Sequence, residues 1–155
     1  MRALVTGGAG FIGSHICQEL LSRGHHVVSV DNLASGRLEN FEEFGDTKNF
    51  EFKKVDILDR EGLPPLFKGT DWVFHMAGLA DIVPSIEKPE LYFDVNVKGT
   101  LNVLEAAKNA GVKRFTYAAS SSSYGIPEKY PPPETPPIAP QYPCLLYTSY
   151  AAADS

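Results

Sequence analysis

Features that would mark several common classes of protein are scarce or missing here. Only two of the 155 residues are cysteine, Cys17 and Cys144, so there is no disulfide framework and a reducing cytoplasm is expected. The formal net charge is −5 and no basic stripe occurs, which argues against nucleic acid as the main partner. No apolar run approaches membrane-spanning length and no charged leader opens the chain, so no membrane association is expected. The four histidines lack carboxylate or thiolate neighbours at ligand spacing, and no metal site is predicted.

The most informative segment is Val5–His15, which reads VTGGAGFIGSH. An apolar run enters a glycine-rich loop that opens into an apolar-periodic segment, which predicts a strand, a loop and a helix. Such a loop brings backbone N–H groups and a helix N-terminus to a phosphate. Gly7 is expected to permit the sharp turn, Gly10 to leave room for a pyrophosphate, and Gly13 to let the helix pack closely on the strand. A P-loop, the nearest alternative, needs a lysine where this chain has Ser14.

The next apolar run, Val27–Val30, ends in Asp31. An acidic side chain at the end of a second strand accepts hydrogen bonds from ribose hydroxyls, and it repels a 2′-phosphate. It therefore favours NAD over NADP. The alternative is that Asp31 only caps the turn Asp31–Leu33, but the strand–loop–helix–strand–acid order favours the dinucleotide interpretation.

Short apolar runs alternate with helical periodicity along the chain. The predicted strands are residues 2–6, 26–31, 50–55, 71–75 and 114–119, and the predicted helices are 11–23, 59–67 and 89–110. This alternation implies parallel strands with right-handed crossovers, so the predicted class is α/β with a Rossmann-type, doubly wound parallel sheet. Phe93, Val97, Leu101 and Leu104 share one face of the last helix and are predicted to face the core.

Polar or small residues follow the third and fourth predicted strands. Asp56-Ile57 is placed to meet an adenine amino group at the carboxyl edge of the sheet, or alternatively to begin the next helix as an N-cap. The small residues within His75–Gly78 would let a flat cofactor lie against backbone, whereas His75 itself indicates only a buried structural histidine. Asn96 is either exposed or holds the loop after the fourth strand.

Two further segments lie beyond these motifs. Hydroxyls within Ser120–Gly125 would hydrogen-bond a reacting sugar hydroxyl or carbonyl, or would form a serine-rich turn; without a Gly-x-Ser-x-Gly elbow, hydrolase chemistry is not supported. Eight of the twelve prolines lie between Pro127 and Pro143. Residues 126–143 are therefore expected to form an extended surface loop, either a disordered linker or a loop that covers substrate.

Together these motifs resemble the extended short-chain dehydrogenase/reductase family, and they look most like its NAD-dependent nucleotide-sugar epimerase/dehydratase branch. The matching segments, in the family's order, are TGGAGFIG at Thr6–Gly13, Asp31–Leu33, Asp56-Ile57, VFHMAG at Val73–Gly78, NVKGTLNVLEAA at Asn96–Ala107 and KRFTYAASSSSYG at Lys113–Gly125. The resemblance implies a cytoplasmic, homodimeric parent enzyme that transiently oxidises a nucleotide sugar at C4. A UDP-hexose or UDP-N-acetylhexosamine 4-epimerase is favoured, because dehydratases of the family usually show Thr-Asp-Glu where this chain has Ser120–Ser122.

The resemblance also implies roles for individual residues. The phosphates, ribose, adenine and nicotinamide of NAD would meet Gly7, Gly10, Phe11, Ile12, Gly13, Asp31, Asn32, Asp56, Ile57, Met76, Ala77, Gly78 and Asn96. Ser120 matches the family's catalytic Ser/Thr, and Ser85, Ser121 and Ser122 match substrate-side positions.

One departure bears on activity. The family's Tyr-x-x-x-Lys pair, in which the lysine lowers the pKa of the tyrosine, does not occur here; Cys144 stands at the aligned tyrosine and Lys129 is the last lysine. We therefore expect an inactive chain and a weak NAD binder, with a partial Rossmann domain over residues 1–125 and no C-terminal substrate domain.

The last residues differ from the family pattern. CLLYTS, which begins at Cys144, corresponds to one translation frame of a transposase-end adapter used in DNA libraries, so residues 144–155 are expected to be a non-native tail. A natural pseudo-enzyme with a divergent tail is the alternative. Two other functions also stay open: a non-catalytic NAD-sensing protein, and an NAD-dependent dehydratase or reductase of the same family.

Overall fold

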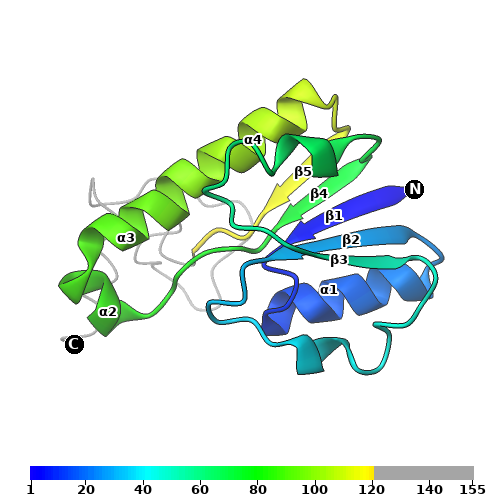
Figure 1. Ribbon diagram of the computed structural model, residues 1–155, viewed down its shortest axis with the longest axis horizontal. Coiled ribbons are helices and arrows are strands. Elements are labelled where there is room, and N and C mark those ends of the chain that lie inside the picture. The colour runs from blue at the N-terminus through cyan, green and yellow to red at the C-terminus, as the bar shows by residue number, and fades with distance from the viewer. Residues whose placement is uncertain (121–155) are drawn as a thin grey trace, which may run out of the picture. The chain divides into compact units, whose positions relative to one another are not determined.

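The computed structural model describes residues 1–120, and the chain divides into two units, residues 1–118 and 119–155. The first unit contains a sheet of five strands: β1 (Arg2–Thr6), β2 (His26–Asp31), β3 (Phe50–Lys54), β4 (Trp72–His75) and β5 (Arg114–Tyr117). All neighbouring strands are parallel, in the spatial order β3-β2-β1-β4-β5 (Figure 1). The chain thus starts in the centre, builds outward to β3, crosses back over β1 and builds outward again. The predicted doubly wound class and all five predicted strands are confirmed.

Two of the three predicted helices, at residues 11–23 and 89–110, are confirmed. α1 spans Phe11–Ser22, and one long helix follows β4, made of α3 (Pro89–Phe93), a π-helical turn (Asp94–Gly99) and α4 (Thr100–Asn109). A short helix that was not predicted, α2 (Ile82–Glu87), precedes it. None of the helices within residues 1–120 combines the length and apolar character needed to cross a bilayer.

The predicted helix at residues 59–67 is wrong. The segment contains only a 3₁₀ turn at Pro64–Phe67, and a second such turn occupies Leu38–Phe41. Two adjacent prolines explain the error, because neither has the N–H that an α-helix needs in its interior. The Asp59 carboxylate instead accepts the amides of Glu61 and Gly62 at 3.1 and 2.9 Å, which closes a turn.

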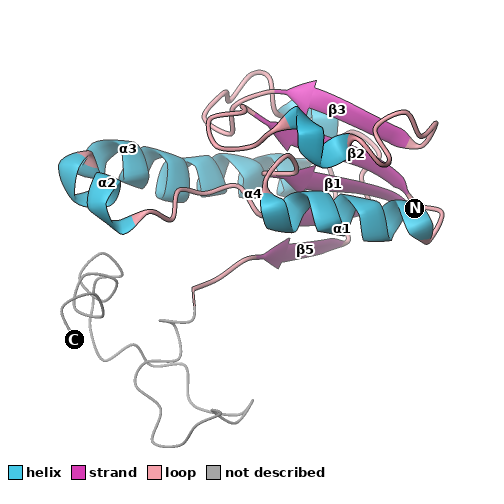
Figure 2. Cartoon of the chain, turned by 90° about the horizontal axis from the view of Figure 1, so that it is seen from below, coloured by secondary structure: helices cyan, strands magenta, loops and turns pink. Residues whose placement is uncertain are grey.

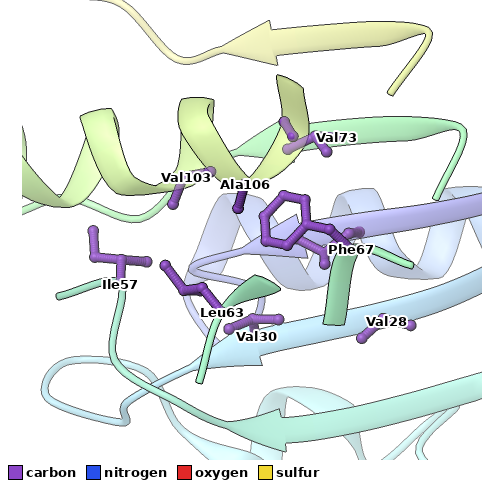
Figure 3. Packing of buried hydrophobic residues seen from close by; sticks show 10 residues of the cluster. Val28, Val30, Ile57, Leu63, Phe67, Val73, Val103 and Ala106 are labelled. Atoms are coloured by element: carbon purple, nitrogen blue, oxygen red, sulfur yellow. The ribbon is translucent and has the colours of Figure 1, made fainter. Parts of the chain in front are cut away.

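Alternate residues along the central strands enter two cores on opposite faces of the sheet. We call them the α4-side core and the α1-side core. The α4-side core consists of Leu4, Val28, Val30, Ile57, Leu63, Phe67, Val73, Val103, Ala106 and Ala107 (Figure 3). The α1-side core consists of Ala3, Val5, Ala9, Cys17, Leu20, Val27, Phe41 and Phe44. Helices on both faces therefore bury the central strands: in Figure 1 α4 and α1 lie on opposite sides of the sheet, and in Figure 2 the strands are spread out with α1 in front of them.

The predicted core face of the long helix is wrong. Phe93, Val97, Leu101 and Leu104 are 43–54% exposed, whereas the residues of α4 that are buried against the sheet are Val103, Ala106 and Ala107. The helix has two apolar faces, and its smaller side chains allow it to approach the sheet closely. The sequence pattern selects the face with the larger apolar side chains, and that face is not the one packed on the sheet. The four larger side chains, which we call the α3–α4 apolar face, remain uncovered within the first unit.

Candidate functional site

The glycine loop forms the turn that the sequence predicts. Gly7 has φ = +66°, a left-handed conformation, and its N–H donates to the carbonyl of Val30 in β2 at 2.8 Å. The first backbone bond of α1 runs from the amide of Ser14 to the carbonyl of Gly10, at 3.0 Å. The amides before it, including those of Phe11 and Ile12, have no acceptor inside the helix. These amides and the positive end of the helix are suited to an anion.

The loop also packs backbone to backbone against the end of β4. A Cβ placed on Gly7 would lie 2.6 Å from the amide nitrogen of Ala77, and a Cβ on Gly13 would overlap the carbonyl oxygen of Gly7. The close approach at Gly13 is thus between the first turn of α1 and the glycine loop where it leaves β1. A Cβ on Gly10 would meet only the carbonyl of Gly7, at 3.2 Å, so the space beyond this glycine is open.

Asp31, at the end of β2, is joined directly to the glycine loop. One carboxylate oxygen accepts the amide of Ala9 at 3.0 Å, and the other accepts the amide of Leu33 at 2.8 Å. The second contact is the turn cap that was the alternative interpretation, and it leaves the ribose role of Asp31 as a prediction. Each carboxylate oxygen has more than one acceptor site, and the residue is 9% exposed, so acceptor capacity remains for ribose hydroxyls. Leu33 takes φ = +64° to complete the turn.

The residues after β2 and β3 meet through a contact that the sequence did not indicate. The side-chain nitrogen of Asn32 donates to one carboxylate oxygen of Asp56 at 2.8 Å. The other oxygen of Asp56 accepts the backbone amide of Leu58, also at 2.8 Å. Asp56 therefore caps a turn and not a helix. The side chain of Ile57 is buried in the α4-side core (Figure 3), which leaves only its backbone for a contact with adenine.

Asn96, in the π-helical turn, holds the loop after β4. Its side-chain oxygen accepts the amide of Leu79 at 2.8 Å, and its side-chain nitrogen donates to the carbonyl of Leu79 at 2.9 Å. Of the two possibilities raised by the sequence, the structure confirms the second. The same loop contains Met76, whose side chain packs on the α1-side core, and the exposed Gly78.

Several residues that build this site were not predicted. Asn40 donates to the carbonyl of Ala9 at 2.7 Å and so ties the loop after β2 to the glycine loop. Thr6 and Thr100 contact the two ring nitrogens of His75. No local pattern identifies these residues, because their partners lie 25 to 69 positions away.

The proposed substrate-side serines are placed less fully. The hydroxyl of Ser85, in α2, donates to the carbonyl of Ile82 within its own helix, at 2.5 Å. Ser120 follows β5 and belongs to the second unit, which is not placed relative to the first. Ser121, Ser122 and the segments 126–143 and 144–155 lie outside the described residues.

Fold and loop geometry together define residues 1–118 as a Rossmann-type domain of the doubly wound class, with a glycine loop between its first strand and first helix. The chain belongs to the family whose model is described as GDP-mannose 4,6 dehydratase, which matches residues 4–153.

Several of the relatives that the chain matches are UDP-glucose 4-epimerases. The chain is 43% identical over 146 residues to the UDP-glucose 4-epimerase of Mycolicibacterium smegmatis, covering 92% of this chain and 46% of the relative. It is 40% identical over 136 residues to a UDP-glucose 4-epimerase sequence of Klebsiella pneumoniae, covering 84% of this chain and 97% of that sequence. The UDP-glucose 4-epimerase of Stenotrophomonas maltophila, solved with NAD and formylated UDP-arabinopyranose, has a TM-score of 0.82 and 35% identity, covering 99% of this chain and 47% of that one. The chain thus spans about half the length of most of the relatives it matches.

Proposed function

We propose that residues 1–118 form the NAD-binding part of a UDP-sugar 4-epimerase. The observation that carries the proposal is the direct link between Asp31 and the glycine loop through the amide of Ala9. This link puts a ribose acceptor and a phosphate-binding helix start within one hydrogen-bonded unit. The solved relative from Stenotrophomonas maltophila, which holds NAD, supports the same assignment.

The residues present fit this cofactor. The space beyond Gly10 is open, and the amides of Phe11 and Ile12 offer hydrogen bonds to a pyrophosphate. Asp31 and Asn32 would hold the adenosine ribose, and the pair Asp56-Ile57 would lie toward adenine. The nicotinamide side would be supported by Met76–Gly78, whose loop is held by Asn96 at the next residue, Leu79. When bound, NAD supplies the acceptor and donor of hydride for transient oxidation of a sugar; the residues of this chain bind and orient it.

The substrate proposed for the whole protein is a UDP-sugar. Names of relatives, which include UDP-glucose 4-epimerases, support this class. Ser85, Ser121 and Ser122 are proposed on the substrate side and Ser120 as the catalytic hydroxyl, with the Tyr-x-x-x-Lys pair absent from these 155 residues. A cytoplasmic location is part of the proposal, and it agrees with Cys17, which is buried and forms no disulfide. Burial raises the pKa of the Cys17 thiol to about 12, so the thiol is protonated.

Asp31 is expected to set the preference for NAD over NADP. The wild-type chain should bind NAD at least tenfold more tightly than NADP, because the buried carboxylate repels a 2′-phosphate. Asp31→Asn keeps an acceptor but removes the charge, so the NAD/NADP affinity ratio should fall toward one. The ratio is obtained by titrating each nucleotide into ¹⁵N-labelled chain, and it does not depend on how much protein is folded.

Asp46→Asn, at an exposed acidic position before β3, is the matched control and should leave the ratio unchanged. Failure of the wild-type chain to bind either nucleotide at millimolar concentration would refute the proposed function. Equal ratios for wild type and Asp31→Asn would refute the assigned role of this residue.

The homodimer implied by the family resemblance is proposed to use the α3–α4 apolar face. Its side chains Phe93, Val97, Leu101 and Leu104 are roughly half exposed, and such a stripe marks interaction surfaces. Leu101→Lys should weaken self-association about tenfold or more, since a buried leucine contributes about 1.5–3 kcal/mol. Sedimentation equilibrium measures this, with Lys108→Glu on the same helix as control; a monomeric wild-type chain at 100 µM would contradict the proposal.

A further inference from the structure

The imidazole of His75 is fully buried at the carboxyl end of β4, between two threonine hydroxyls. Its Nδ1 lies 2.6 Å from Oγ1 of Thr6 in β1, and its Nε2 lies 2.9 Å from Oγ1 of Thr100 in α4. The rings of Phe115 and Tyr117 in β5 lie 6.0 and 5.7 Å from it, the second one stacked at 23°. None of these four groups is a carboxylate that would favour an imidazolium.

The hydrogen bonds around Thr100 fix which ring nitrogen carries the proton. The backbone N–H of Thr100 donates to Val97, and its hydroxyl donates to the carbonyl of Asn96 at 2.7 Å. A hydroxyl has a single proton, so toward His75 this oxygen is an acceptor. Nε2 of His75 must therefore be the protonated nitrogen.

The other side of the ring follows from the same rule. A neutral imidazole protonated on Nε2 has an acceptor at Nδ1, so the hydroxyl of Thr6 donates to it. The Thr6 oxygen in turn accepts the amide of Ala77, at 3.4 Å. A proton on Nδ1 would leave two protons facing each other across 2.6 Å unless the Thr6 hydroxyl turned away. Burial lowers the pKa of His75 to about 4, which agrees with a neutral ring.

We propose that His75 is a positioning residue whose neutral, Nε2-protonated ring joins β1, the loop after β4 and the π-helical turn in one directed hydrogen-bond chain. The chain runs from the amide of Ala77 through Thr6, His75 and Thr100 to the carbonyl of Asn96. Because the side chain of Asn96 clamps Leu79, both ends of the chain act on the same loop. That this loop faces the nicotinamide rests on the proposed function; the chain itself does not.

The tautomer is tested on the 155-residue chain without nucleotide. In chain labelled with ¹⁵N-histidine, the ring spectrum of His75 should show a protonated Nε2 and an unprotonated Nδ1 from pH 8 down to pH 5.5. His75→Gln identifies the signals by their loss. An Nδ1-protonated tautomer, or an imidazolium within this range, would overturn the proposal.

Positioning is tested with a conservative pair at Thr100. Thr100→Val removes the hydroxyl at nearly constant volume, and Thr100→Ser restores it. Hydrogen exchange of the Leu79 amide should accelerate at least tenfold in Thr100→Val and return to near the wild-type rate in Thr100→Ser. The amide of Val28 in β2 reports global stability and serves as the internal control.

Equal acceleration at Leu79 and Val28, or no rescue by serine, would mean that Thr100 acts only through general packing. Exchange and tautomer are both measured without NAD. A wild-type chain that shows the directed hydrogen bonds but binds no NAD would therefore refute the proposed function alone.

Discussion

Gly7→Ala is expected to lower the free energy of unfolding by about 3 kcal/mol, and to abolish nucleotide binding in the fraction that folds. Two costs add. The left-handed φ of +66° costs an alanine about 1–2 kcal/mol, and the new Cβ meets backbone atoms of Met76 and Ala77 at 2.6–2.8 Å. Overpacking of this kind costs about 1–3 kcal/mol, and backbone does not yield as a flexible side chain does. Urea unfolding followed by circular dichroism measures the loss.

Gly24→Ala separates the two costs. Gly24, which follows α1, has φ = +76°, but a Cβ there would have no atom within 4 Å. Only the conformational cost applies, so the expected loss is about 1 kcal/mol. If the two variants are equally destabilised, the close approach between the glycine loop and the end of β4 contributes nothing.

Local conformation can be predicted from the sequence, whereas contacts between distant parts of the chain cannot. Strands and the glycine loop depend on neighbours along the chain: an apolar run, then glycines at the turn, then helical periodicity. The positions of Asp31 and Asp56 follow from topology, because parallel strands bring their carboxyl ends to one edge of the sheet. The contact of Asn32, which follows Asp31, with Asp56 agrees with this rule.

The errors arise where packing across the fold decides. Ile57 follows a strand, as a ligand-contacting residue does, but its side chain enters the core beside Gly99. The long helix buries its alanines and leaves Leu101 and Leu104 exposed, because close contact with a sheet favours small side chains. His75 is buried, as expected of a structural histidine, but its two threonine partners are missed because they are 69 and 25 positions away. None of these contacts has a signature in sequence spacing.

His75 is also expected to make the domain sensitive to mild acid. Burial lowers its pKa from 6.5 to about 4 in the native state, whereas the unfolded chain retains the ordinary value. Above pH 6.5 the ring is neutral in both states and does not affect the pH dependence. As the pH falls below 6.5 the unfolded state binds a proton that the native state does not, so the native state loses stability. The loss grows until about pH 4 and amounts to about 3 kcal/mol there.

His75→Gln isolates this contribution, because carboxylates also titrate in acid. Glutamine keeps a donor near the position of Nε2 and cannot become charged, so its stability should fall less between pH 7 and pH 4.5. The free-energy gap between wild type and variant, from urea unfolding at each pH, should therefore shift by about 2–3 kcal/mol in favour of the variant at the lower pH. His15→Gln, on an exposed position of α1, controls for the loss of an imidazole as such. A gap for His75→Gln that stays constant between the two pH values would mean that the buried ring is protonated in the native state, and the directed hydrogen-bond chain through Thr6 could not then exist below neutral pH.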